Sequence, residues 1–206
     1  MKKIVVLFLT LTITGFSYAQ FTIGPQIGYA ASNLTLNVDS IANDVKSNFV
    51  VGAFARFGKK IYFQPEINWA TSGSVFTYPT YGNGSPVSQE IKIKSIQVPL
   101  SLGWRIINMK VVNIRVYAGV TPSFNTDITI NTKNGDGADY LVPDDFKNVL
   151  WNYQVGAGVD VLFLALNVSW MGGMSNVFTE DINFSGQTLS SKSNLFQVTL
   201  GWKIFK

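Results

Sequence analysis

The amino-acid sequence predicts an all-β fold, an eight-stranded antiparallel up-and-down transmembrane β-barrel preceded by a cleaved signal peptide. Three observations carry this prediction. Segments along the chain alternate apolar and polar residues with the period of two that is typical of β-strands. Long and short connections between these segments alternate strictly, and the apolar face of each segment carries no charge. The last two features are typical of barrels that cross an outer membrane.

Composition favours a membrane environment. Apolar residues make up 47% of the 206-residue chain and charged residues only 14%, whereas soluble domains contain roughly 25% charged residues. Beyond the amino terminus, no segment reaches the roughly 18 apolar residues that a membrane-spanning helix needs. The chain has no cysteine, so its stability must come from packing or from a closed sheet rather than from disulfides.

Residues 1–19 have the pattern of a secretory signal peptide, which leaves residues 20–206 as the barrel domain. Two lysines precede an apolar core over residues 4–13, and small residues occupy the two positions that determine cleavage before Gln20. An uncleaved signal anchor is the alternative, disfavoured because the apolar core is short. Cleavage leaves 14 basic and 12 acidic residues, a net charge of +2. So small an excess indicates no nucleic-acid partner.

The first three strands are predicted at residues 21–30, 48–57 and 61–69. In the first, the odd-numbered residues from Phe21 to Tyr29 are apolar, apart from a proline, and the even-numbered ones are small or polar. The second and third strands alternate in the same way. A Gly-Lys-Lys sequence at 58–60 makes the tight turn between them.

The fourth strand, at 91–105, changes phase. Ile91 and Ile93 are apolar in one phase and the residues from Ile96 onward in the other, which predicts a β-bulge near Ser95. A short link leads to the fifth strand at 112–122.

The last three strands are predicted at 151–161, 164–171 and 196–204. The first two form a hairpin with apolar rows from Trp151 to Val161 and from Leu164 to Trp170. Taken alone, this hairpin fits either a membrane barrel or a soluble sandwich. The connections decide between the two. Long connections of roughly 15 to 23 residues, at 32–47, 71–90, 125–147 and 173–193, alternate with turns of a few residues, as in barrels with short periplasmic turns and long external loops.

Aromatic residues of the apolar face concentrate at both ends of the strands, where they would form two interfacial girdles. On the turn side these residues are Phe21, Phe57, Trp104 and Trp202, and on the loop side they are Tyr29, Phe49, Trp69, Phe124, Trp151, Trp170 and Phe196.

Three motifs resemble successive signatures of one family. They are SIQVPLSL at 95–102, VYAGVTP at 116–122 and VGAGVD at 155–160. The chain is similar here to the PorT-like outer-membrane β-barrel proteins of Gram-negative bacteria, described as porin family proteins, and the resemblance covers essentially the whole mature chain. It implies a barrel in the cell outer membrane. The carboxyl end departs from the usual pattern, since barrels generally finish on an aromatic residue recognised by the barrel-assembly machinery and here Lys206 follows Phe205.

The polar face carries the charged residues predicted to lie in the lumen, namely Arg56, Glu66, Arg105, Arg115, Asp160 and Lys203. The interior of an eight-stranded barrel is just wide enough for side chains to fill it, so we expect these charges to pair and plug the lumen. A narrow gated pore, or an acid/base pair of Glu66 and Asp160, are the alternatives. With a plug, Arg115→Ala is expected to lower barrel stability, measured by unfolding in detergent.

No catalytic, cofactor or metal site is predicted. The chain has no histidine, which excludes Ser-His and Cys-His catalysis and His-dependent zinc sites. The acidic loop with Asp136, Asp139, Asp144 and Asp145 lacks the bidentate Glu of a calcium loop, so a solvated loop is expected. The pair Gly156 and Gly158 lies inside a strand and lacks the third glycine of a nucleotide site, which favours a role in strand packing.

We therefore expect a small non-enzymatic outer-membrane barrel with a structural or surface-interaction role. The expected partners are outer-membrane lipid, the barrel-assembly machinery and an unknown external ligand or protein. The external contacts would come from aromatic residues of the long loops, namely Phe76, Tyr78, Tyr81, Tyr140, Phe146, Phe178 and Phe184. The alternatives are a narrow porin or transport channel, and an accessory component of a protein-secretion system; a lipid-modifying or proteolytic barrel is disfavoured because the usual histidine is absent.

Overall fold

The computed structural model describes residues 20–36, 42–78, 87–133, 143–178, 182–184, 187–189 and 191–204. These residues are almost entirely β-strand. The strands are β1 (Phe21–Leu36), β2 (Ala42–Phe57), β3 (Ile61–Tyr78), β4 (Val87–Gln97), β5 (Leu100–Asn108), β6 (Val112–Lys133), β7 (Val149–Val161), β8 (Leu164–Gly173), β9 (Ile182–Phe184), β10 (Gln187–Leu189) and β11 (Ser191–Trp202), with one short 3-10 helix, η2 (Pro143–Asp145). In these parts of the chain, no helix is long and apolar enough to cross a membrane.

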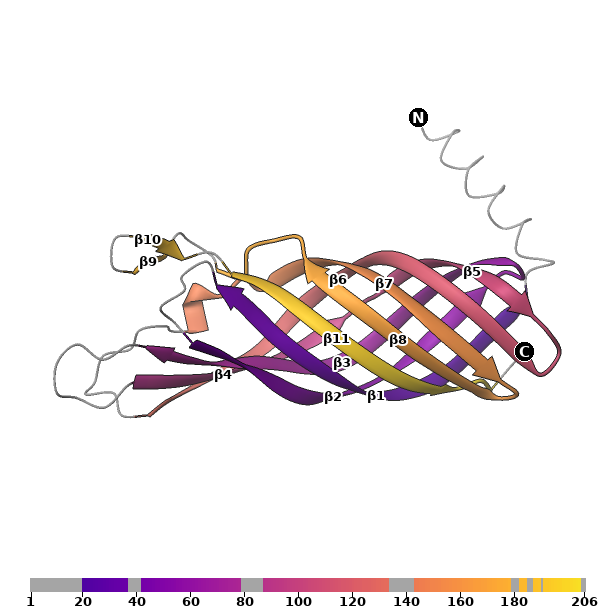
Figure 1. Ribbon diagram of the computed structural model, residues 1–206, viewed down its shortest axis with the longest axis horizontal. Helices are drawn as coiled ribbons and strands as arrows, with labels where there is room; N and C mark the ends of the chain where they lie inside the picture. The colour runs from indigo at the N-terminus through magenta and orange to yellow at the C-terminus, as the bar shows by residue number, and fades with distance from the viewer. Residues whose placement is uncertain are drawn as a thin grey trace, which may run out of the picture.

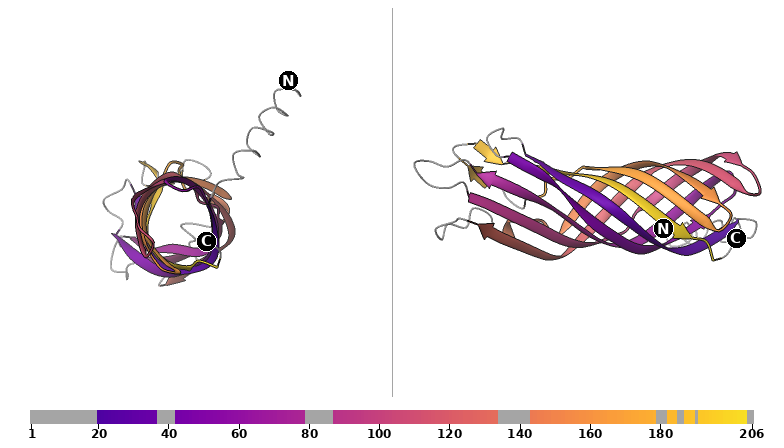
Figure 2. Two further views of the ribbon diagram at one scale, coloured as in Figure 1. Left: turned by 90° about the vertical axis from the view of Figure 1, so that its right-hand side faces the viewer. Right: turned by 60° about the horizontal axis from the view of Figure 1, so that its bottom comes forward.

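The strands close into an antiparallel barrel, which confirms the predicted fold class. The main sheet has the order β2-β1-β11-β8-β7-β6-β4-β3-β5, and additional pairings of β2 with β3 and of β5 with β6 complete the ring. Because β4 and β5 are two halves of one strand, broken at Val98 and Pro99, the wall has eight strands. Viewed along its axis, the wall is a closed ring (Figure 2). The small hairpin of β9 and β10 lies at the end opposite the short turns (Figure 1).

Three short turns connect the strands at one end of the barrel. Gly58 in the β2–β3 turn has a φ of 123°, a backbone conformation that favours glycine. Leu162 in the β7–β8 turn has a φ of 52°, and its amide donates a hydrogen bond to the Val111 carbonyl of the neighbouring turn, 3.0 Å away. Tight turns at this end agree with the predicted hairpins.

The predicted long loops are wrong in extent, because much of each one is β-strand. β1 and β2 stay paired as far as Ser32 and Lys46, and β3 and β4 as far as Tyr78 and Val87. β6 continues beside β4 to Lys133. The paired wall therefore continues, on the side opposite the short turns, well beyond the ends of the predicted strands (Figure 1). These outer parts of the strands carry many polar residues, so their sequence lacks the apolar alternation of the predicted strands.

The β-bulge predicted near Ser95 lies in β6 rather than in β4. β4 keeps a constant alternation, with Ile91, Ile93, Ser95 and Gln97 all facing inward and buried. The extra residue is Thr126 of β6, since Lys94 pairs with Asp127 while Ser95 pairs with Asn125. A β-bulge therefore lies at the predicted height, but on β6. The apolar pattern of β4 changes because the inward side chains change from polar to apolar at this height.

This reversal divides the barrel into two zones along its axis. In the membrane zone, apolar side chains face out and polar ones face in. In the outer zone, Ile91 and Ile93 are buried inside, while Lys94 and Asp127 form an exposed ion pair outside, 2.7 Å apart. Such a polar exterior around an apolar interior is the arrangement of a protein in water. The outer zone is thus built to stand in solvent.

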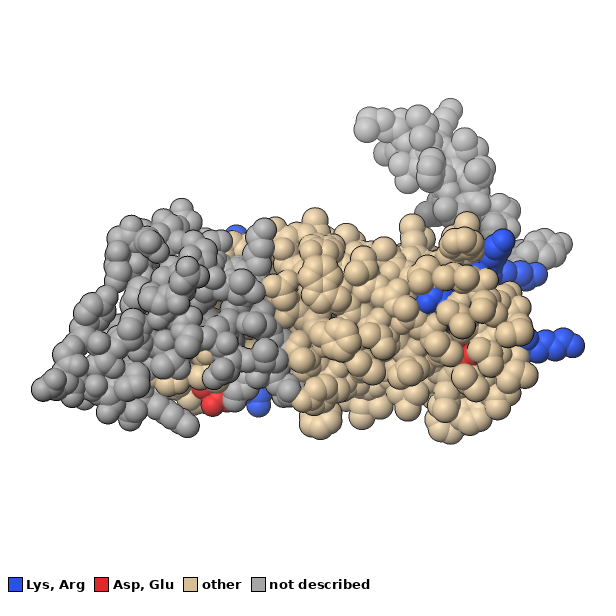
Figure 3. Space-filling view, viewed as in Figure 1, with Lys and Arg blue, Asp and Glu red and all other residues tan. Residues whose placement is uncertain are grey.

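The outward face of the membrane zone is apolar, and the centre of the visible surface carries no charged residue (Figure 3). All residues predicted for the two girdles are exposed except Phe57, which is half-buried with its ring centroid 5.1 Å from that of Phe21. Two further aromatic residues, which the sequence did not assign to the girdles, pack against girdle residues. The ring centroids of Tyr153 and Trp170 lie 5.3 Å apart, and those of Phe163 and Trp202 lie 4.9 Å apart.

Gly156 and Gly158 allow large inward side chains of β6 to lie against β7. A Cβ at Gly156 would lie 2.5 Å from the Tyr117 ring, and one at Gly158 would lie 2.7 Å from the Arg115 guanidinium. Both glycines face residues of β6 directly across the ladder. The small residues of the VGAGVD motif thus serve side-chain packing.

Gly156→Val is expected to destabilise the barrel by about 1 to 3 kcal/mol, because the new side chain overpacks the buried Tyr117 ring. The measurement is urea unfolding in detergent followed by tryptophan fluorescence. Ala157→Val is the matched control, since Ala157 is the next residue and faces outward. A comparable loss of stability in both variants would contradict the packing role of Gly156.

Candidate functional site

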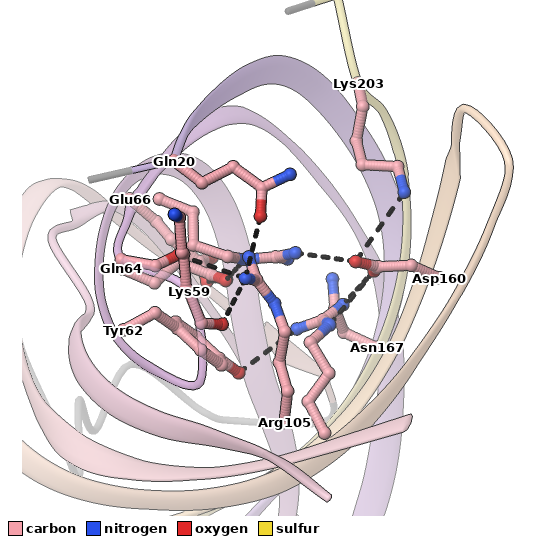
Figure 4. A network of polar contacts seen from close by, with 12 residues as sticks. Gln20, Lys59, Tyr62, Gln64, Glu66, Arg105, Asp160, Asn167 and Lys203 are labelled. Atoms are coloured by element: carbon pink, nitrogen blue, oxygen red, sulfur yellow. Dashed lines mark hydrogen bonds and ion pairs between the residues drawn. The ribbon is translucent and has the colours of Figure 1, made fainter. Parts of the chain in front are cut away.

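The lumen network is centred on Asp160 of β7, near the turns. Its carboxylate accepts a hydrogen bond from Arg56 Nη1 at 2.7 Å and one from Arg115 Nε at 3.0 Å. Arg115 Nη2 lies 2.8 Å and Lys203 Nζ 3.6 Å from the same carboxylate. One acid thus holds three cations that come from β2, β6 and the end of β11 (Figure 4). The side chains of Arg56, Arg115 and Asp160 are at most 3% exposed.

Neutral side chains extend the network across the lumen. Arg115 also donates to Asn167 Oδ1 at 2.6 Å and to the Tyr62 hydroxyl at 3.4 Å. Arg56 Nε donates to Gln64 Oε1 at 2.7 Å. The Arg56 guanidinium also lies 5.1 Å from the centre of the Tyr62 ring, within cation–π range. These groups come from opposite walls, so together they bridge the barrel.

Glu66 is held by amides rather than by cations. Its carboxylate accepts hydrogen bonds from Gln26 at 2.7 Å, Gln64 at 2.7 Å and Asn68 at 3.2 Å. Among the described residues, no ion pair joins Glu66 to the predicted cations. The expectation that all six charges pair with one another is therefore wrong for Glu66. An acid/base pair of Glu66 with Asp160 is also disfavoured, since separate sets of donors hold the two carboxylates.

Arg105 forms a separate contact at the turn end. It donates to the Gln20 side chain at 3.1 Å and to the Gly58 carbonyl at 3.0 Å, and also to the Lys59 carbonyl. All three acceptors are neutral. In the described part of the chain, no ion pair neutralises Arg105, which again differs from the predicted mutual pairing.

The lumen beyond the network is also filled. Gln154 accepts a hydrogen bond from Thr121 at 2.9 Å and donates one to Ser101 at 2.8 Å. Farther from the turns lies an apolar cluster of buried residues, made of Ala30, Val50, Ala70, Met171 and Leu195. Along the interior, polar pairing near the turns is thus followed by apolar packing farther from them.

Two of the loop aromatics are buried rather than exposed. Phe146 and Phe178 form an isolated β-bridge with ring centroids 5.4 Å apart, and the Lys147 amide donates to the Val177 carbonyl at 2.9 Å. Their predicted role in external contacts is wrong, because these contacts join two connections to each other. Of the other predicted aromatics, Phe76 and Tyr78 lie in β3 and Phe184 in β9, while Tyr81 and Tyr140 lie outside the described residues.

Several remaining predictions fall outside the described residues. These are the signal peptide, the terminal Phe205 and Lys206, and most of the acidic loop, including Asp136 and Asp139. Asp144 and Asp145 lie in η2. Within the described ranges, no group of three or more acidic residues is arranged to hold a metal ion.

The predicted lumen network did not include its neutral members, above all Tyr62, Gln64 and Asn167. Each lies on the inward phase of its strand, so the alternation that placed the charges also places these residues. A single sequence does not show which inward residues lie at the same height in the barrel. It therefore did not indicate which of these residues contact one another.

The closed wall, the uncharged outward belt and the polar lumen side chains define a small outer-membrane β-barrel. The family model for the outer membrane protein beta-barrel domain matches residues 16–179, more than half of the chain, and the chain belongs to this family. The protein is accordingly located in the outer membrane, in contact with its lipid. No curated protein matches the chain at a significant level.

Solved outer-membrane barrels have a similar fold. The outer membrane protein OprG from Pseudomonas aeruginosa has a TM-score of 0.54 and 10% sequence identity, over 91% of this chain and 98% of that one. For Ail, the attachment invasion locus protein of Yersinia pestis, the TM-score is 0.47 and the identity 10%, over 90% and 99% of the two chains. For Neisserial surface protein A the TM-score is 0.47 and the sequence identity 11%, over 88% of this chain and 97% of that one. At such identities the likeness concerns the fold alone.

Proposed function

We propose that the protein is a non-enzymatic surface barrel that presents its outer zone to an external partner and conducts no solute through its lumen. The observation that carries this proposal is the reversal of polarity along the wall. The outer zone has an apolar interior and a polar exterior, so it projects from the membrane as a rigid β-structure. A rigid projection is suited to binding because its residues are already ordered.

The filled lumen supports a binding role over a transport role. A solute would have to displace the Asp160 ion pairs and then the apolar cluster around Met171. Both features support the proposal that the lumen has no continuous water-filled path. The absence of histidine from the sequence supports the proposal that the protein is not an enzyme.

The exposed face of the outer zone is the proposed contact surface. On β6 it presents Asp127, Thr129 and Asn131, which are all exposed, and on β4 it presents Lys92 and Lys94. These strands pair directly, so the side chains form one continuous polar patch. This patch replaces the loop aromatics Phe146 and Phe178 as the proposed binding surface.

The proposal is tested by cysteine labelling and by conductance. The chain has no native cysteine, so Thr129→Cys and Lys110→Cys each introduce a single reporter. In intact cells, a membrane-impermeant maleimide should label Thr129→Cys at once and Lys110→Cys only after the outer membrane is permeabilised. In planar bilayers, the purified barrel should show no steady conductance. A stable open channel would favour the narrow porin instead, and labelling of Lys110→Cys in intact cells would contradict the proposed orientation.

We also propose that the chain is a PorT-like member of its family, inserted by the barrel-assembly machinery. The three motifs that carry this resemblance lie in β4 to β7. They supply lumen residues, including Tyr117, two positions after Arg115 in β6, and Asp160. A role as an accessory component of a secretion system is the alternative function. Loss of protein secretion on deletion of the gene, restored by the wild-type chain, would favour that alternative.

A further inference from the structure

We propose that the turn-side mouth of the lumen is a binding site for a phosphate group. The site is a cavity of about 310 Å³ at the turn end of the barrel. The lining includes Arg56, Arg105, Lys110, Asn113, Asp160 and Lys203. A water molecule occupies about 30 Å³ in the liquid, so the cavity has room for a phosphate with several waters.

The charge of the lining favours an anion. Among the described lining residues, four cationic side chains, those of Arg56, Arg105, Lys110 and Lys203, occur with a single carboxylate, that of Asp160. This carboxylate is already shared with Arg115, which lies deeper in the lumen. The described lining thus carries more basic than acidic side chains, and these would attract an anion at the mouth.

Two buried polar atoms strengthen the assignment. Among the described residues, Arg56 Nη2 and Asn113 Oδ1 have no hydrogen-bond partner, although both side chains line the cavity. Arg56 is only 1% exposed, and an unpaired guanidinium N–H in such surroundings is costly. A phosphate oxygen would accept from Arg56 Nη2, and a protonated phosphate oxygen or a water would donate to Asn113 Oδ1.

Arginine and lysine supply complementary recognition here. A guanidinium offers directed N–H donors that match phosphate oxygens, and a lysine ammonium adds an adjustable point charge. Arg105 directs its Nη1 to neutral acceptors at the mouth, so its acceptors among the described residues leave its charge in place. Because the Asp160 network closes the lumen behind the cavity, the ligand enters and leaves on the turn side. The site therefore binds a phosphate group rather than passing it through.

The test is a titration of the folded full-length mature barrel in neutral detergent with inorganic phosphate, at constant ionic strength set by chloride. Heat-modifiable gel mobility first verifies folding of every variant. Isothermal calorimetry should show saturable binding to one site. Lys203→Gln should weaken the binding by about tenfold or more, the loss expected for one charge-assisted hydrogen bond. Lys110→Gln, at the rim of the same cavity, should also weaken it and serves if Lys203→Gln does not fold.

Lys147→Gln is the matched control, because it removes the same charge outside both the cavity lining and the proposed contact surface, and its binding should equal that of the wild type. A second titration uses a short-chain phosphatidylglycerol in place of inorganic phosphate. Binding of inorganic phosphate indicates a soluble phosphate ligand, and binding of the lipid alone indicates a headgroup; either supports the site. No saturable binding of either probe, or equal weakening by Lys147→Gln, would overturn the proposal.

Discussion

Replacing Asp160 with asparagine is expected to destabilise the barrel by about 3 to 5 kcal/mol, the cost of removing one partner from a buried ion network. Asparagine keeps the shape of the side chain and removes only its charge. Arg56 and Arg115 would then lie in the lumen without their counter-charge, each with a former contact of 3.0 Å or less to the carboxylate. The free energy of unfolding is measured by urea titration in detergent, with tryptophan fluorescence as the signal.

Asp127→Asn is the matched control for this prediction. Asp127 forms an ion pair with Lys94 at 2.7 Å, the same distance that separates Asp160 from Arg56. Its side chain is 48% exposed, however, compared with 3% for Asp160. Exposed pairs contribute only about 0 to 1 kcal/mol, so Asp127→Asn should change stability little. Equal effects of the two substitutions would show that burial does not decide the value of the pair.

The Arg115→Ala variant extends the same test. Arg115 shares the Asp160 carboxylate, so the effects of Arg115→Ala and Asp160→Asn should be less than additive in the double variant. The second substitution removes an interaction that the first has already broken. Additive effects would mean that the two side chains act independently, contrary to the 2.8 Å ion pair between them.

Val168→Arg is expected to cost about 2 to 4 kcal/mol of folding free energy, the penalty for an arginine on the lipid face near the bilayer midplane. Val168 of β8 is exposed on the outward face and pairs with Ala157 and Val198. On the same strand it lies between Trp170, in the loop-side girdle, and Leu164, which pairs with Trp202 of the turn-side girdle. The measurement is reversible folding into phospholipid vesicles.

Asn131→Arg provides the comparison for this substitution. Asn131 is exposed on β6 in the outer zone, where the wall stands in water. The same new side chain should therefore cost less than about 1 kcal/mol, as is usual for surface substitutions. A large penalty at Asn131 would place the membrane boundary farther out than the reversal of polarity does. A negligible penalty at Val168 would contradict lipid contact on the outward face.

Local sequence determined the strands of the membrane zone and the direction of their side chains. A period of two fixes which residues share a face, and the absence of charge from one face identifies it as the lipid face. Arg56 and Asp160 were thus placed in the lumen without any tertiary information. The turns could also be predicted, because Gly58 and the abrupt reversal after Val161 are local signals.

Tertiary structure alone decided what the inward residues contact and where the membrane zone ends. Asp160 pairs with Arg56 across 104 residues of chain, and only the register and tilt of the closed wall bring two such residues to one height. The outer strands were hidden because the solvent reverses their pattern: in water, Ile91 and Ile93 turn inward, whereas in lipid the apolar residues turn outward. The sequence shows which positions are apolar and which are polar. Which of the two faces inward depends on whether lipid or water surrounds the wall, and the fold determines where along the wall lipid gives way to water.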